Sequence, residues 1–253
     1  MEIQEFISTS LDQPFIGGID EAGRGPVLGD MVYCLALEPL GYEWPELIND
    51  SKKLDAPTRE AILKALKINY FLVSIPATYI SEHMLNGISL NDIALDATQM
   101  LLSRVKDLDM KCIYVDTLGH AKHHQIRLEK ITKHPVVVES KADTKYKSVM
   151  GASICAKVHR DSLIAQDMGS GYPGDPNTIK YLNTIHNIFG YKDHVRFSWQ
   201  TTKDKTKLLK IVFENEVVVD KKSKKNFKEK GQMTLHFGIK KKKLSINRNM
   251  ISF

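Results

Sequence analysis

The sequence has no apolar run approaching the roughly 18 residues that a membrane-spanning helix requires. Its opening, MEIQEFISTS, is acidic and polar, and lacks the basic start and apolar stretch of a secretory signal peptide. Only 3 cysteines occur in 253 residues, each alone in an apolar context. This pattern favours buried thiols in a reducing compartment over a disulfide framework. We therefore expect an intracellular globular protein with no membrane partner.

Acidic residues are nearly missing from one region, residues 221–253, which hold ten Lys and one Arg against the single acid Glu229. That region carries a net charge of +10, so the whole-chain value of +6 leaves −4 on residues 1–220. A composition of 42% hydrophobic residues can bury a core and excludes disorder of the whole chain. We expect a folded domain over residues 1–205, a helical extension over 206–220 and a basic, disordered tail.

Strand-like and helix-like segments alternate along the folded part. Strands are expected at 15–20, 27–37, 69–75, 112–115 and 136–139, and helices from Pro57, from Ser89 to about Val105, after Asp116, from Asp143 to about Met168, from 179 to 188 and after Thr201. Ser89 followed by Asp92 has the form of a capping box, and Pro57 suits a first helical turn. An initial hairpin followed by alternation predicts an α/β fold, a mixed sheet flanked by helices.

Four acids stand out by position: Asp20 and Glu21 at the end of the first strand, Asp116 at the end of another, and Asp143 at the start of the helix rich in small residues. Sites in α/β sheets gather at the carboxyl ends of strands, so these acids can converge. Carboxylates in one cleft repel each other and call for a cation, and oxygen-only ligands suit Mg²⁺ or Mn²⁺. Taken singly, each acid is better explained as a strand-end turn residue or helix cap, but turn chemistry alone explains the Asp20–Glu21 pair beside three glycines poorly.

Several motifs follow one another along the chain: Asp-Glu-Ala-Gly-Arg-Gly-Pro-Val-Leu-Gly (20–29), Asp-Ser-Lys-Lys-Leu (50–54), Val-Asp-Thr-Leu-Gly (115–119), Lys-Ala-Asp (141–143), Ala-Ser-Ile-Cys-Ala-Lys-Val (152–158), Gly-Ser-Gly-Tyr-Pro (169–173) and Val-Arg-Phe-Ser-Trp (195–199). Together they resemble type 2 ribonuclease H, leaning toward the eukaryotic catalytic subunit. The resemblance spans roughly residues 14–205, in the family's order and spacing.

The resemblance implies a ribonuclease H-like catalytic domain with a C-terminal helical extension, and it makes Asp20, Glu21, Asp116 and Asp143 the ligands of two Mg²⁺ or Mn²⁺ ions. The implied enzyme cuts RNA in RNA–DNA hybrids and 5′ of single ribonucleotides in duplex DNA, leaving 3′-hydroxyl and 5′-phosphate ends. Ribonucleotide excision repair and DNA replication are the implied processes. The implied location is the nucleus in a eukaryote and the cytoplasm otherwise, with two accessory subunits in eukaryotic relatives.

The same resemblance assigns substrate contacts to Gly23, Arg24 and Gly25, whose backbone groups can distinguish a ribose by its 2′-hydroxyl. A dinucleotide-binding loop is rejected, because the glycine spacing is one residue off that pattern and no helix signal follows. The resemblance also makes Tyr172 the aromatic that stacks at the RNA–DNA junction. A tyrosine folded back on the core is the alternative.

Three further residues are assigned by resemblance alone. Lys52 and Arg160 match positions that contact backbone phosphates, and Asn91 matches a position near the DNA strand. Charges on a helix surface explain Lys52 and Arg160 equally well, and the capping segment explains Asn91. The cluster of His120, His123 and His124 lacks zinc-ligand spacing and is expected on a solvated helix.

The basic tail has more than one interpretation. Its Lys runs suit a nuclear-import signal or contacts with DNA phosphates. Met233–Phe237 has a degenerate likeness to a peptide that binds a sliding clamp, and a solvated tail with a transient apolar patch explains it better. For the whole protein two alternatives remain open: a catalytically silent subunit that binds hybrids, and another metal-dependent nuclease on the same fold. The four acids argue against the first, and Gly23–Gly25 with Tyr172 against the second.

Overall fold

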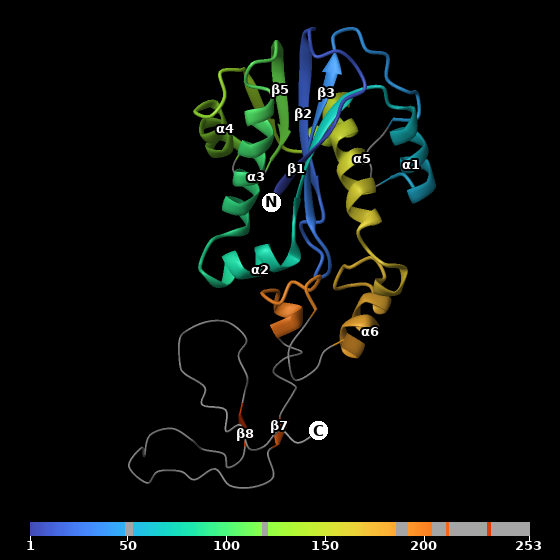
Figure 1. Ribbon diagram of the computed structural model, residues 1–253, viewed down its shortest axis with the longest axis vertical. Helices are drawn as coiled ribbons and strands as arrows, with labels where there is room; N and C mark the ends of the chain where they lie inside the picture. The colour runs from blue at the N-terminus through green and yellow to red at the C-terminus, as the bar shows by residue number, and fades with distance from the viewer. Residues whose placement is uncertain (49–52, 118–120, 186–191, 204–210, 213–231, 234–253) are drawn as a thin grey trace.

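A mixed six-stranded sheet forms the centre of the computed structural model, which describes residues 1–48, 53–117, 121–185, 192–203, 211–212 and 232–233 (Figure 1). The strands are β1 (Glu2–Phe6), β2 (Phe15–Ala22), β3 (Met31–Pro39), β4 (Asn69–Ile75), β5 (Met110–Asp116) and β6 (Val136–Glu139), in the order β1-β4-β3-β2-β5-β6. Neighbours from β1 to β2 are antiparallel, whereas β2, β5 and β6 run parallel. The expected hairpin is the β2–β3 pair, and the α/β prediction is confirmed.

Helices cover both faces of the sheet (Figure 1). They are α1 (Ala56–Ala65), α2 (Ala77–Leu85), α3 (Leu90–Arg104), α4 (Ala121–Glu129), α5 (Lys147–Ser162) and α6 (Pro176–Ile185), with 3₁₀ turns η1 (Ala142–Thr144) and η2 (Gln166–Met168). Ser89 caps α3 as predicted, because its hydroxyl accepts from the Asp92 amide and donates to the Asp92 carboxylate. Helix α2 and the mostly exposed edge strand β1 were not predicted, because their sequences show no clear hydrophobic periodicity.

The long helix expected from Asp143 to Met168 is shorter than predicted. Asp143 lies in η1, because Lys141 before it adopts a left-handed backbone with φ of 59° and Tyr146 after it is extended. Helix α5 then begins at Lys147, and the 3₁₀ turn η2 follows it separately. A positive φ at a lysine is uncommon, and nothing in the local sequence signals it.

The small residues of α5 let this helix approach the sheet closely, as predicted. A Cβ added at Gly18 on β2 would lie 2.1 Å from the Ser148 carbonyl carbon on α5. One apolar cluster joins α5 and α1 to the sheet, and another joins α3 to the opposite face. The close approach brings Ser153 of α5 next to the end of β2, where Asp20 lies.

A third, smaller cluster joins α6 to the chain after β2, through Leu28, Leu182 and Val195 among others. Beyond residue 203 the structure describes two short strands, β7 (Ile211–Val212) and β8 (Gln232–Met233), which pair antiparallel. Residues 211 and 212 are therefore extended, in keeping with their β-branched side chains, and not helical as expected. The rest of the expected extension and tail lies outside the described residues. Among the described helices, none has the length and apolarity to cross a membrane.

Candidate active site

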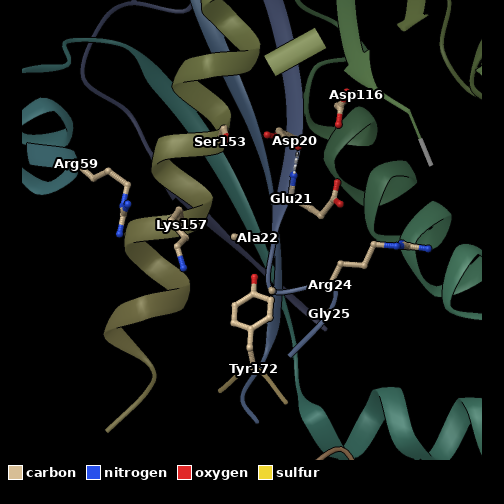
Figure 2. Close-up of a pocket in the computed structure, with 11 residues that line it drawn as sticks. Asp20, Glu21, Ala22, Arg24, Gly25, Arg59, Asp116, Ser153, Lys157 and Tyr172 are labelled. Carbon is tan, nitrogen blue, oxygen red and sulfur yellow. Dashed lines mark hydrogen bonds between the residues drawn. The ribbon is translucent and has the colours of Figure 1, made fainter. Parts of the chain in front are cut away.

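Two of the predicted acids are placed side by side by strand register. Ile19 of β2 pairs with Val115 of β5 in parallel register, so Asp20 and Asp116 follow directly on adjacent strands. Alternation along each strand directs them away from the face that buries Ile19 and Val115. Both line one open pocket together with Glu21 (Figure 2). The predicted convergence of acids at strand ends therefore holds for these three.

Asp20 is the most enclosed carboxylate of the pocket, with 6% of its surface exposed. Burial raises its pKa well above 3.8, and the charges of Glu21 and Asp116 raise the pKa further. Hydrogen bonds from Ser153 and from the Glu21 amide, the latter at 2.8 Å, oppose this shift. The carboxylate is thus held at a fixed place beside two other acids.

Asp143 does not line the pocket, but the turn that carries it contacts Asp116. Turn η1 is tied to β5, because the Ala142 amide donates to Asp116 Oδ1 at 3.0 Å. Asp143, the next residue, is buried with 3% exposure. Among the described residues, no three acids, histidines or cysteines are close enough together to surround one ion. The donors nevertheless fit a hard divalent cation, since all are carboxylates and, after burial, the neighbouring charges of Glu21 and Asp116 raise the pKa of Asp20.

The loop Gly23–Gly25 lines the same pocket and depends on glycine at its first position. Gly23 has a φ of +84°, and a Cβ there would lie 2.6 Å from the Asp30 carbonyl oxygen. The Arg24 side chain turns away from the acids and donates a hydrogen bond to Asn91 Oδ1 (Figure 2). The structure thus brings Asn91, at the start of α3, to this loop.

Tyr172 lies across the pocket from the acids (Figure 2). Its side chain is 41% exposed, so the alternative of a tyrosine folded into the core is wrong. The Arg160 guanidinium lies beneath it, 5.5 Å from the ring centroid. Arg160 is 2% exposed and donates to Asp161 and to the Ser170 carbonyl at 3.0 and 2.8 Å. It is therefore no helix-surface charge, and it supports the Tyr172 loop instead of presenting its guanidinium to solvent.

Two basic side chains of the pocket were not predicted from the sequence. Arg59 of α1 and Lys157 of α5 line its far side, and both pair with Asp161, at 3.4 and 2.8 Å (Figure 2). Lys157 belongs to the motif Ala-Ser-Ile-Cys-Ala-Lys-Val (152–158). It lies four residues after Ser153 and so on the same helix face, and this spacing could have predicted its place in the pocket. Lys52, which was predicted to contact phosphate, lies outside the described residues.

Two other predictions need correction. His124 is buried, with 7% exposure, and not on a solvated surface; burial lowers its pKa to about 4. His123 is exposed as expected, and His120 lies outside the described residues. Cys34 and Cys155 are buried free thiols as predicted, whereas Cys112 is partly exposed.

A mixed sheet that delivers carboxylates from adjacent strands to a pocket with basic and aromatic walls is an arrangement suited to a hydrolase of phosphodiesters. Residues 17–202 match the family model Ribonuclease HII. This chain therefore belongs to the ribonuclease HII family. It is a type 2 ribonuclease H, an endoribonuclease of RNA–DNA hybrids.

Relatives and solved structures agree with this assignment. The A subunit of ribonuclease H2 from Dictyostelium discoideum is 35% identical over 78% of this chain and 79% of its own, and its Homo sapiens namesake is 34% identical over 76% and 72%. The ribonuclease H2 structure from Pyrococcus horikoshii has a TM-score of 0.64 at 30% identity, covering 75% of this chain and 96% of that one. Ribonuclease HII from Archaeoglobus fulgidus, solved with PCNA, has a TM-score of 0.65 at 31% identity, covering 74% and 95%.

Proposed function

We propose that this enzyme cuts the RNA strand of RNA–DNA hybrids and also cuts 5′ of a single ribonucleotide embedded in duplex DNA, leaving 3′-hydroxyl and 5′-phosphate ends. One observation carries the proposal: a single pocket is lined by the acids Asp20, Glu21 and Asp116, by the loop Gly23–Gly25 and by Tyr172. Groups suited to hydrolysis and groups suited to contacting a sugar therefore face the same space.

The four acids Asp20, Glu21, Asp116 and Asp143 would hold two divalent cations, Mg²⁺ or Mn²⁺. Such ions supply a water of lowered pKa and offset charge on the attacking and leaving oxygens of a phosphodiester. The support from this chain is the raised pKa of Asp20, which reflects burial first and then a repulsion from Glu21 and Asp116 that bound cations relieve. A Bst ribonuclease HIII structure was solved with Mn²⁺; at 18% identity and a TM-score of 0.61 it supports the fold alone.

The remaining groups position the substrate. Backbone groups of the Gly23–Gly25 loop contact the ribose 2′-hydroxyl, which both donates and accepts hydrogen bonds. Tyr172 packs on the neighbouring sugar, and its exposed ring is free of the core. Lys157 and Arg59 supply positive charge on the far side of the pocket, where the phosphate backbone passes.

Location and partners are further parts of the proposal. We place the enzyme in the nucleus of a eukaryote or the cytoplasm of a prokaryote, acting in ribonucleotide excision repair and DNA replication. The relatives that are A subunits of ribonuclease H2 indicate a complex, and we propose two accessory subunits for it. The archaeal enzyme solved with PCNA supports a sliding clamp as a partner. Most of the expected clamp-binding segment, Met233–Phe237, lies outside the described residues.

The decisive experiment compares two short duplexes that differ only in one ribonucleotide, incubated with the full chain and Mg²⁺. Cleavage 5′ of the ribonucleotide is expected, with loss on chelation and in Asp20→Asn and Asp143→Asn. A chain that is inactive alone and becomes active with accessory subunits would belong to the multi-subunit group.

Equal cleavage of the all-DNA duplex would contradict ribose recognition and favour a different metal-dependent nuclease. Hybrid binding without turnover, even with accessory subunits present, would favour a catalytically silent subunit instead. Persistent cleavage by both Asn variants would remove these acids from catalysis.

A further inference from the structure

The segment His194–Trp199 is packed along the back of the Gly23–Gly25 loop. Leu28 and Val195 form an isolated antiparallel bridge, and the amides of Gly29 and Arg196 donate to the carbonyls of His194 and Val27 at 2.7 and 2.8 Å. This segment belongs to the Val-Arg-Phe-Ser-Trp motif, to which the proposed chemistry gives no task.

The side chains of this segment hold the carbonyl oxygens of the loop. Arg196 Nη2 donates to the Gly23 oxygen at 2.6 Å, and Nη1 donates to the Arg24 oxygen at 3.1 Å. Trp199 Nε1 donates to the Gly25 oxygen at 3.2 Å. All three peptide carbonyls of the loop are therefore fixed from behind by two side chains.

Several interactions hold the Arg196 side chain in one position. Its side chain is fully buried, its Nε donates to the Gly29 oxygen at 2.9 Å, and its Cζ lies 4.9 Å from the centroid of the Trp199 ring. Burial, together with the charge of Arg160, lowers the pKa of Arg196 to about 9, so the guanidinium stays charged at neutral pH. A buried charge is costly unless its donors are matched, and here the loop carbonyls match them.

Fixed carbonyls determine where the next residue's amide points, because each peptide group is planar and the N–H of the following residue lies opposite the C=O. The held carbonyls of Gly23 and Arg24 therefore orient the amides of Arg24 and Gly25, whereas the Gly25 carbonyl, held by Trp199, belongs to the peptide bond to Pro26, which has no N–H. Within the described part of the chain, the amides of Arg24 and Gly25 donate no hydrogen bond to another backbone group, and the loop lines the pocket. These two amides are therefore held at the substrate side in advance of binding, with the end of the loop fixed by Trp199.

We infer that Arg196 and Trp199 are positioning residues that set the preference for ribose over deoxyribose by fixing the peptide groups of Gly23–Gly25. They touch no substrate and act through the loop. The inference rests on the proposed contact between the loop and the 2′-hydroxyl. A loop with the same sequence but unfixed carbonyls would lose conformational entropy when the ribose binds. Its preference for ribose over deoxyribose would therefore fall.

The test compares Arg196→Lys and Trp199→Phe with the wild type. Lysine keeps the positive charge but lacks the planar set of N–H donors of the guanidinium. Phenylalanine keeps an aromatic ring beside Arg196 but lacks the indole N–H. Trp44→Phe is the matched control: Trp44 is also a buried indole, but it packs against Gly151 on α5, away from the loop. Each protein, with accessory subunits if the wild type needs them, is assayed for binding in Ca²⁺ to a duplex with one ribonucleotide and to its all-DNA counterpart. Thermal unfolding of each variant is recorded in parallel.

We expect the binding ratio between the two duplexes to fall about fivefold to tenfold in Arg196→Lys and Trp199→Phe, the effect of losing one or two net hydrogen bonds. Affinity for the all-DNA duplex should be unchanged, and Trp44→Phe should lower the unfolding temperature while keeping the ratio. A wild-type ratio in Trp199→Phe and Arg196→Lys overturns the inference, as does an equal loss on both duplexes. A wild-type protein with no preference for the ribonucleotide would refute the proposed function itself.

Discussion

The Tyr172 ring faces Gly25 across a gap that would just hold a methyl group: a Cβ at Gly25 would lie 3.5 Å from Cε1 of Tyr172. The two residues belong to segments far apart in the chain, but they form one wall of the pocket (Figure 2). The amides of Val27 and Leu28 hold the Tyr172 loop in place by donating to the Gly171 oxygen at 2.8 and 3.2 Å. The surface proposed to contact the ribose is thus continuous with the surface proposed to contact the next sugar.

Replacing Tyr172 with alanine should impair cleavage at single ribonucleotides more than cleavage of long hybrids. Loss of stacking on one nucleotide amounts to about 1–3 kcal/mol, a rate loss of at least about fivefold at a single site. A long hybrid offers many alternative registers and should lose less. Initial rates on both substrates give the comparison, with Tyr172→Phe as the control that keeps the ring. Equal losses on both substrates would remove Tyr172 from junction recognition.

Asp20→Asn should stabilise the metal-free protein at neutral pH while abolishing turnover. The folded-state pKa of Asp20 is raised above 3.8, so its ionisation opposes folding. That penalty is absent at low pH and grows as pH rises above 3.8. We expect the unfolding temperature at pH 7 to rise by about 2–4 °C, and Mg²⁺ to stabilise the wild type more than the variant.

The exposed Asp96 on α3 provides the control for this comparison. Asp96→Asn should leave both the unfolding temperature and its response to Mg²⁺ unchanged. An Asp20→Asn variant that is less stable than the wild type at pH 7 and in the absence of metal would show that the carboxylate is needed for folding, contrary to the repulsion among the acids.

Gly18→Ala should destabilise the protein by about 3 kcal/mol or prevent folding, because α5 cannot move away without disturbing the core. The added Cβ would overlap the backbone of α5 at Ser148 and Val149. Urea denaturation measures the loss. Gly174→Ala is the matched control, since a Cβ there meets no atom within 4 Å. Similar stability of the two variants would mean that α5 is not pressed against β2.

His124→Leu should reduce the loss of stability in acid. Burial lowers the folded-state pKa of His124 to about 4 from 6.5, so below pH 6.5 the unfolded chain binds a proton that the folded chain does not. This histidine therefore costs stability progressively as pH falls from 6.5 to about 4, and nothing above 6.5. Unfolding temperatures from pH 7.5 to 4.5 should fall less steeply in the variant. His123→Leu, at the exposed neighbouring position, should show the wild-type slope.

Deletion of residues 221–253 should spare turnover on short duplexes at low salt. The acids of the pocket lie outside this segment, which contributes a charge of +10. Its removal should weaken the salt dependence of binding to long DNA, because each neutralised phosphate adds to that slope. Turnover and binding at several salt concentrations test both statements. Loss of turnover at low salt would show that the tail takes part in catalysis.

Local signals predicted the parts of this fold that depend on neighbours in sequence. The capping pair Ser89 and Asp92 marked the start of α3, and the strand ends at Asp20 and Asp116 marked the edge where the pocket forms. Both follow from short-range rules, hydrogen bonding at a helix terminus and the parallel arrangement of strands.

Contacts between distant segments were beyond such rules. The hydrogen bonds from Arg196 to the loop, and the pairing of Arg59 with Asp161, join residues on different elements and leave no periodic trace. The burial of Arg160 was likewise hidden, because a cation at the end of a helix resembles a solvated charge until the loop above it is placed. Tertiary packing, not local preference, decided these positions.

The short stretch Val27–Gly29 receives both the segment around Arg196 and the loop of Tyr172. Two surfaces that are bonded to the same short segment keep a constant spacing and cannot move independently of each other. With the substrate contacts proposed above, a junction of different width cannot be accommodated by moving one of these surfaces alone. Across the pocket, Arg59 and Lys157 extend from separate helices and both pair with Asp161. The wall proposed to contact the sugar is thus anchored on one short segment of the chain, whereas the basic wall is carried by two helices.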